Sequence, residues 1–292
     1  MRLKKMSTKI QAIMLMLLSS LCFAAMGAMV KLSGQIPTFE KAFFRNFVSL
    51  FFSAFLLMKH RQYPWGKPEN RPMLLGRSVF GTIGMLCYFY GIDRLILADS
   101  GMLNKMHPFF VTIFAFLFLK EKISWHQLVS LLVALTGSAL IIKPGFDFSQ
   151  SGPAFICFLS AVFAGLAYVF VSYLGNRENS YTIVFWFSLI SSLITLPLAL
   201  MHFRMPSPAQ LLLLIGAGGA SAGGQFSLTV AYRYAPAGEV SIYNYSNVIF
   251  SSIFGFMLFA EIPDLLSVSG YLLIIAAGYL TFRLGSEKRQ HS

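Results

Sequence analysis

Three polar residues interrupt an apolar stretch that runs from residue 95 to residue 119. Lys105 lies near the middle of this stretch, with Asn104 and His107 beside it. A lysine can bind an anion, an asparagine both donates and accepts hydrogen bonds, and a histidine can carry a proton. If the stretch crosses a membrane, a central lysine that faces lipid costs roughly 2.5–3.5 kcal/mol. What this lysine does therefore depends on the elements that surround it.

The composition is that of an all-α polytopic membrane protein. Of the 292 residues, 56% are hydrophobic and only 12% are charged, whereas a soluble domain carries about 25% charged residues. Apolar stretches of about 20 residues, each long enough to cross a ~30 Å hydrocarbon core as a helix, recur along the chain. We predict ten transmembrane helices in a lipid bilayer, at 9–32, 39–58, 72–91, 95–119, 123–142, 152–174, 181–202, 208–232, 236–259 and 265–283.

The lysines and arginines behind the net charge of +12 are unevenly divided between the two expected sides of the membrane. With the N-terminus inside, the expected cytoplasmic segments hold sixteen lysines and arginines, Arg77 among them, and the opposite side holds five. This bias follows the positive-inside rule, so no nucleic-acid partner is implied. We expect a multi-pass protein of the bacterial plasma (inner) membrane with both termini cytoplasmic, including a tail at 284–292.

The chain repeats itself at an offset of 140 residues. The repeat divides it into a first half, 9–142, and a second half, 152–283, with five helices in each. Because five is odd, the second half starts on the opposite side of the membrane, which makes the two repeats inverted. The matching residues are Ser20, Phe23 and Ala24 with Ser160, Phe163 and Ala164, Gly76 and Gly84 with Gly216 and Gly224, and Asn104 with Asn244.

Four segments resemble one known family. They are "PFFVTIFAFLFLKE" (108–121), "VIFSSIFGFMLFAEIPD" (248–264), "FFRN" (43–46) and "YFYGIDRL" (88–95). Together they resemble the EamA branch of the drug/metabolite transporter superfamily, over nearly the whole chain. The resemblance implies ten helices in two five-helix halves and transport of a small molecule, with a substrate that differs between members. The second half departs from the pattern where Val248 replaces a repeated Pro108.

Small and polar residues form matching stripes on spans four and nine. At 100° per residue, each set lies within an arc of about 100°. The two sets are Gly101, Asn104, Lys105, Pro108, Thr112 and Ala115, and Ser241, Asn244, Tyr245, Val248, Ser252 and Gly255. Lys105 then faces the space between the halves, where inverted-repeat transporters bind substrate. The alternatives are interhelical hydrogen bonding by the asparagines and an internal ion pair of Lys105. Since the carboxylates lie at or near span ends, we favour an anionic substrate.

Further residues are candidates for the same site. Arg45 either extends to the outer interface or makes a second cationic contact with substrate. His107 is either a packed, hydrogen-bonded histidine or a proton relay, and Pro108 is expected to kink span four. Gln225 ends the glycine-rich segment 216–225, which we expect to pack closely against another helix, and could face the substrate. Tyr88 is one of several tyrosines that could stack on a ligand.

Two acidic residues at span ends are assigned a structural role. Glu121 and Glu261 end spans four and nine, just before another helix starts. We expect them to favour the N-terminus of that next helix, because a carboxylate is stabilising there.

The leading hypothesis is a secondary transporter, for uptake or export, of a small polar metabolite that is anionic or zwitterionic. An integral membrane enzyme would need paired carboxylates or clustered histidines, and the five histidines are scattered. A non-transporting scaffold or sensor would not require Lys105. The three cysteines lie within spans and imply no disulfide framework or metal site. We expect no catalytic residues and no cofactor, and the sequence carries no signal for an oligomeric state.

Overall fold

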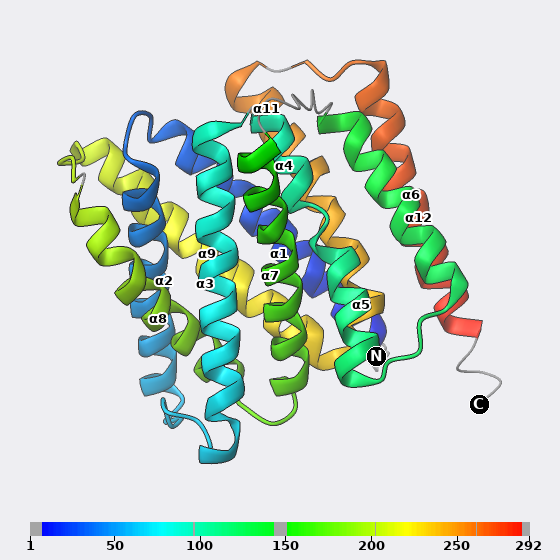
Figure 1. Ribbon diagram of the computed structural model, residues 1–292, viewed down its shortest axis with the longest axis horizontal. Coiled ribbons are helices and arrows are strands. Elements are labelled where there is room, and N and C mark those ends of the chain that lie inside the picture. The colour runs from blue at the N-terminus through cyan, green and yellow to red at the C-terminus, as the bar shows by residue number, and fades with distance from the viewer. Residues whose placement is uncertain (1–7, 96, 143–150, 202, 261, 288–292) are drawn as a thin grey trace, which may run out of the picture.

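The computed structural model describes residues 8–95, 97–142, 151–201, 203–260 and 262–287, and their regular structure is entirely helical (Figure 1). Ten helical segments among these residues are long and apolar enough to cross a membrane. The elements are α1 (Thr8–Leu32), α2 (Thr38–Lys59), η1 (Pro68–Asn70), α3 (Arg71–Arg94), α4 (Leu97–Asn104), α5 (His107–Leu119), α6 (Trp125–Ile142), α7 (Ser151–Leu174), α8 (Ser180–Met201), α9 (Pro208–Tyr234), α10 (Ala237–Val240), η3 (Ser241–Tyr245), α11 (Ser246–Phe259) and α12 (Leu265–Glu287).

The ten predicted spans are confirmed, and two of them are broken. Span four consists of α4 and α5, which are separated by a turn at Lys105 and Met106. Span nine consists of α10, the 3₁₀ segment η3 and α11. The last helix, α12, continues beyond residue 283 into the expected tail, and residues 288–292 lie outside the described residues.

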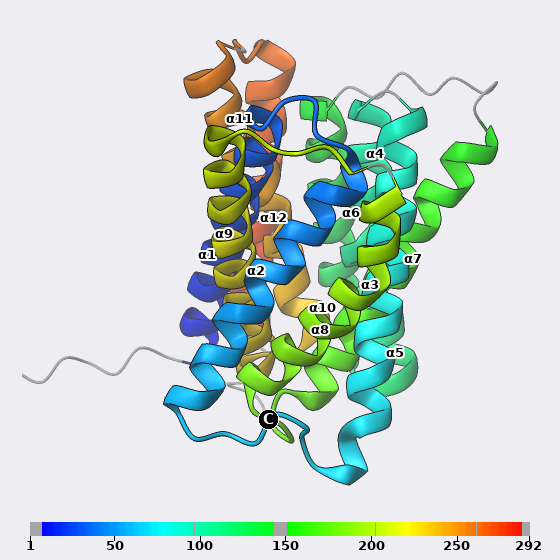
Figure 2. The ribbon, with the colours of Figure 1, turned by 90° about the vertical axis from the view of Figure 1, so that its left-hand side faces the viewer.

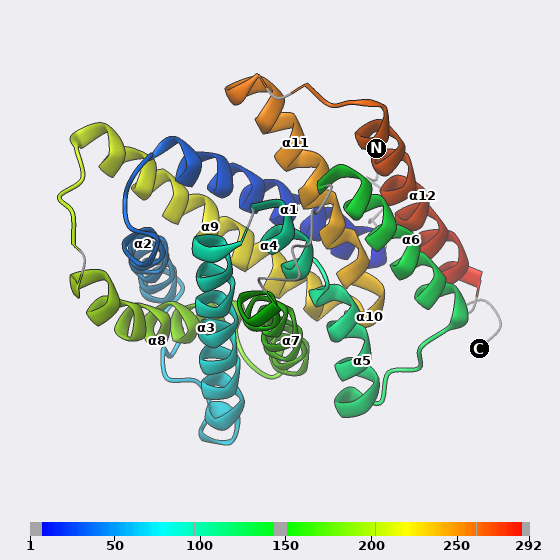
Figure 3. The same ribbon diagram turned by 45° about the horizontal axis from the view of Figure 1, so that its top comes forward.

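The helix pairs of the bundle follow a two-fold pattern. Helix α1 packs on α9 and α3 packs on α7, so the first span of each half lies against the third span of the other. The pairs α2–α8 and α6–α12 each join equivalent spans of the two halves. Figures 1 and 2 show α2 and α8 on one side of the bundle, and Figure 3 shows α6 and α12 on the other. The halves therefore interlock rather than form separate bodies.

Glycines permit the closest of these helix contacts. A Cβ atom on Gly84 of α3 would lie 3.1 Å from the Ser160 carbonyl oxygen of α7. At the equivalent place in the other pair, a Cβ atom on Gly224 would lie 3.0 Å from the Phe23 ring of α1. Both distances are tighter than ordinary contacts, so the helices approach closely at these points. The expected close packing of the glycine-rich segment 216–225 is confirmed.

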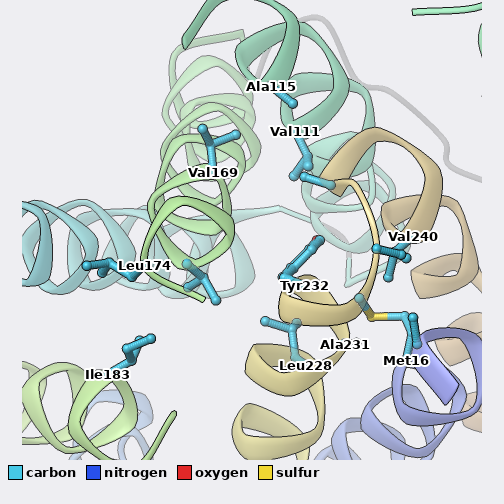
Figure 4. Close-up of a cluster of buried hydrophobic side chains, with 14 of the residues drawn as sticks. Met16, Val111, Ala115, Val169, Leu174, Ile183, Leu228, Ala231, Tyr232 and Val240 are labelled. Atoms are coloured by element: carbon cyan, nitrogen blue, oxygen red, sulfur yellow. The ribbon is translucent and has the colours of Figure 1, made fainter. Parts of the chain in front are cut away.

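Two apolar clusters fill the bundle, and apolar side chains also cover its outside. The larger cluster joins α1, α3, α5, α7, α8, α9 and α10. Figure 4 shows Tyr232 of α9 projecting toward Val111 of α5 within it. The smaller cluster joins α6, η3, α11 and α12. Large apolar residues such as Phe51, Phe118 and Leu212 are exposed, as expected for helices whose outer surface meets lipid.

Both ends of the described chain lie at the same end of the bundle. Lys9, near the start of α1, donates from Nζ to the Phe282 carbonyl oxygen of α12 at 3.1 Å. Its Nζ atom is also 3.6 Å from a carboxylate oxygen of Glu239 in α10. This is expected for an even number of spans, because each span takes the chain across to the other side and an even number brings it back.

Candidate functional site

The break in span four has a local chemical cause. Pro108 has no N–H to donate to the carbonyl of Asn104, four residues earlier. His107 donates from Nδ1 to this carbonyl oxygen at 3.0 Å and so satisfies it. The expected kink at Pro108 is present as the turn between α4 and α5. His107 is a buried, hydrogen-bonded residue whose Nε2 atom has no hydrogen-bond partner in the described part of the chain.

Lys105 connects the two broken spans. Its ammonium donates to Oδ1 of Asn247, in the first turn of α11. Asn247 in turn donates from Nδ2 to the Ser20 carbonyl oxygen of α1 at 2.9 Å. In the part of the chain that the structure describes, Lys105 has no carboxylate within the 4 Å of an ion pair. The lysine therefore faces the protein interior and has a neutral partner.

The two asparagines at the breaks have different surroundings. Asn104 donates from Nδ2 to Oγ of Ser160 in α7 at 3.0 Å. Asn244 is buried, and its Nδ2 atom has no hydrogen-bond partner. The Ser241 hydroxyl is also buried without a partner. The second break thus contains polar groups that the described residues leave unsatisfied.

Tyr245 occupies the position equivalent to Lys105 and points elsewhere. It is fully buried in the smaller apolar cluster, and its hydroxyl has no partner. The uniform 100° rotation used for the stripe does not hold here, because η3 is a 3₁₀ helix with about 120° per residue. Over its five residues the error grows to about 100°. Asn247, outside the predicted stripe, consequently meets Lys105 instead.

A second polar group lies between α2, α3 and α9. Arg45 of α2 donates from Nε to the Ser221 hydroxyl at 2.9 Å and from Nη1 to the Met85 sulfur at 3.0 Å. Arg77 of α3 donates from Nη2 to Oε1 of Gln225 at 3.0 Å. Arg45 therefore points into the bundle and does not extend to the outer interface. Gln225 is buried and faces this group.

The assignment of Arg77 to a cytoplasmic segment was wrong. Its side chain is only 2% exposed and lies inside α3. Counting charges by their distance from the end of a span does not reveal which way a side chain points. Without Arg77, the excess of basic residues on that side of the membrane persists.

Aromatic side chains connect the two groups. The Tyr168 ring of α7 is 5.4 Å from the His107 ring and 5.9 Å from the Arg77 guanidinium carbon. The Tyr232 ring is 5.9 Å from the Tyr168 ring. Tyr88 lies farther along α3 beside Phe89. Sequence reasoning missed Tyr232 and Asn247, although Asn247 is the repeat equivalent of His107.

Glu121 has a different role from the one expected. Its two carboxylate oxygens accept the backbone N–H groups of Ala237 and Gly238 in α10, at 3.0 and 3.1 Å. The next helix in the chain, α6, has its own cap, in which Ser124 and Gln127 bond each other's backbone N–H groups. Glu121 thus joins the end of span four to the start of span nine. Glu261, its repeat equivalent, lies outside the described residues.

The model of the EamA-like transporter family matches this chain twice, at residues 10–143 and 152–283. The chain belongs to this family. A pseudopaline exporter of Pseudomonas aeruginosa is 36% identical over 269 residues, which cover 91% of this chain and 93% of the exporter. An S-adenosylmethionine uptake transporter of Rickettsia prowazekii is 26% identical over 270 residues, covering 89% and 87%. Both of these relatives are named as transporters.

A solved crystal structure has the same fold. It superposes with a TM-score of 0.85 at 13% identity and covers 96% of this chain and 99% of its own. The ten-helix EamA fold described above is therefore also the fold of an experimentally determined chain.

Proposed function

We propose that this EamA-like protein is a secondary transporter of a small polar metabolite that carries at least one carboxylate or phosphate group. The observation that supports this most strongly is Lys105, a cation at the break of span four whose partner is the neutral Asn247. A lysine inside a membrane span is costly and is tolerated where it serves a function. An anionic group of a substrate would supply the missing counter-charge.

We infer that transport occurs by alternating access between two inverted halves. Each half has one interrupted span, and interrupted helices at the repeat interface are typical of secondary transporters. The contact from Lys105 to Asn247 joins one interrupted span to the other. A rearrangement of the helices at this contact would therefore change the surroundings of this lysine. Since nothing in the sequence resembles a nucleotide-hydrolysing domain, active transport would draw on a gradient or on exchange.

The test is solute counterflow with purified protein in proteoliposomes. Labelled glutamate, citrate, inorganic phosphate and S-adenosylmethionine would sample anionic and zwitterionic classes, with labelled choline, a cation without a carboxylate or phosphate, as the comparison. We expect trans-acceleration by at least one solute with a carboxylate or phosphate and none by choline. A thermal-shift screen supports the choice of solutes, because a ligand at 100 times its Kd adds about 2.7 kcal/mol of stability. Exchange of the cationic solute alone would contradict the proposal.

We also propose that both termini are cytoplasmic, in the inner membrane of a bacterium. The basic residues support this orientation, because cytoplasmic segments carry an excess of lysine and arginine. A cysteine introduced at Pro64, in the loop after α2, should be labelled only when the inner face is accessible. Labelling of this position from outside in intact cells would overturn the orientation.

A further inference from the structure

Arg77 is a buried cation with an incomplete set of partners. Its Nη2 atom donates to Gln225, whereas its Nε atom is buried and has no hydrogen-bond partner among the residues that the structure describes. The guanidinium carbon lies 4.1 Å from the centre of the Phe187 ring and 5.9 Å from that of Tyr168. These rings and one amide are neutral, so the full positive charge remains uncompensated by the described residues.

The backbone of α3 leaves space for this guanidinium. Gly81 lies one turn after Arg77, and a Cβ atom placed on Gly81 would overlap Nη1 of Arg77. The arginine side chain therefore extends along its own helix over the glycine. A side chain at residue 81 would displace the guanidinium from its present position.

A second arginine lies close to the first. Arg45 contacts Ser221, and Arg77 contacts Gln225, one turn later on α9. Side chains four residues apart on a helix have Cβ atoms about 5–6 Å apart. The other partner of Arg45 is the sulfur of Met85, which is a weak acceptor. Two like charges are thus held near each other, and the described part of the chain pairs neither with a carboxylate.

We propose that Arg77 and Arg45 form a binding site for a second anionic group, a carboxylate or phosphate, of the transported molecule. This inference rests on the proposed function and refines it. The planar guanidinium matches both anions with two parallel hydrogen bonds, which a lysine cannot provide. The Tyr168 ring contacts both Arg77 and His107, two residues after Lys105. The substrate class is accordingly a molecule with two anionic groups, one for Lys105 and one for the arginine pair.

The first test is the thermal stability of the purified full-length protein without added solute. If Arg77 is an uncompensated cation, Arg77→Gln should melt at the same temperature as the wild type or higher, because it removes a buried charge. Arg94→Gln is the matched control, since Arg94 is an exposed arginine of the same helix. Marked destabilisation by Arg77→Gln, with none by Arg94→Gln, would mark Arg77 as a structural cation and overturn the inference.

The second test compares solutes that differ by one carboxylate. Counterflow of glutarate and butyrate, and of glutamate and glutamine, would be measured in the wild type, Arg77→Gln, Arg77→Lys and Arg94→Gln. We expect the wild type and Arg94→Gln to prefer the member with the extra carboxylate. Arg77→Gln should lose about 10- to 100-fold of that preference, and Arg77→Lys should recover part of it. An unchanged preference in Arg77→Gln would overturn the inference while leaving the proposed function intact. Absence of anion transport in the wild type would instead contradict the proposed function.

Discussion

Spans four and nine have the same backbone plan and different chemistry. Each is interrupted at the equivalent place, and each ends in a residue with a left-handed conformation, Lys120 with φ 56° and Ala260 with φ 54°. The N–H groups of these residues donate to Ala115 and Gly255, which are also 140 residues apart. Proline contributes to the break in span four but is not required for a break at this place, since the second half has Val248 where the first has Pro108.

The side chains at the breaks are where the halves diverge. The first break presents Lys105 and a satisfied Asn104. The second presents Tyr245 within an apolar cluster and an unsatisfied Asn244. The comparison teaches that the interrupted span supplies the geometry in both halves, whereas the charge that would select a substrate is confined to one. Substitutions at the two breaks, and at the Glu121 contact between the two spans, would break or sharpen this comparison.

Placing the charge on the second break should have the largest effect. Tyr245→Lys would bury an unpaired ammonium in the apolar cluster of α6, η3, α11 and α12, at a cost of at least about 3 kcal/mol. We expect little folded protein in size-exclusion chromatography. The control is Tyr245→Phe, which removes a hydroxyl without a partner and should be neutral or stabilising. A lysine variant as stable as the wild type would show that the two breaks are chemically interchangeable.

Removing the carboxylate that joins the two spans should have an intermediate effect. Glu121→Ala leaves the Ala237 and Gly238 N–H groups without their acceptors, at a cost of about 1–3 kcal/mol. Chemical denaturation of the detergent-solubilised protein measures this loss. If the alanine variant is as stable as the wild type, water replaces the carboxylate at these two N–H groups at no cost, and the contact is incidental.

The same carboxylate gives the contact a pH dependence. Burial raises the pKa of the Glu121 carboxyl, the Glu239 carboxylate adds to this, and the two backbone N–H groups oppose it. A raised pKa means that the folded state holds the proton more tightly than the unfolded state. This stabilisation is complete below the ordinary pKa of glutamate and is lost as the pH rises through the raised value. The melting temperature of the wild type should therefore fall relative to that of Glu121→Gln over this window. If the difference between the two melting temperatures stayed constant with pH, the pKa of Glu121 would not be raised in the folded state.

The asparagines should show the smallest effect. Asn104→Ala removes the bond to Ser160 and should cost about 0.6 kcal/mol, the average for hydrogen bonds between membrane helices. Asn244→Ala removes an Nδ2 donor that has no hydrogen-bond partner among the described residues, and should cost less than Asn104→Ala. Matched melting curves of the two variants test the asymmetry. Equal losses would show that Asn244, like Asn104, makes a hydrogen bond in the membrane.

Most of the fold could be predicted from the sequence. A membrane helix must satisfy its backbone hydrogen bonds internally, so an apolar stretch of about 20 residues is sufficient to locate it. The repeat at an offset of 140 residues could be detected because equivalent helices pack through equivalent small residues, such as Gly84 and Gly224. The break in span nine could not be predicted, since it has no proline at that place.

The site could be predicted only in part. Lys105 and Asn104 were identifiable because a polar residue in mid-span is rare and costly. Arg77 was not, because it lies near enough to a span end to resemble a topology charge. Tyr245 was misplaced and Asn247 was missed for a different reason: the 3₁₀ segment η3 rotates the helix face, and no residue in it signals that change. Side-chain direction, rather than residue type, was the missing information.

Counterflow by variants of Lys105 tests the central claim most directly. The solute is the anion that the wild type exchanges best, and Lys59→Ala, which changes an exposed lysine at the end of α2, is the control. Lys105→Ala should lose about 1.5–3 kcal/mol of substrate binding at normal membrane expression, and Lys105→Arg should retain part of the transport. Loss of expression together with transport would assign Lys105 a structural role. Full transport by Lys105→Ala would contradict the account, because the anion would then have been bound without this lysine.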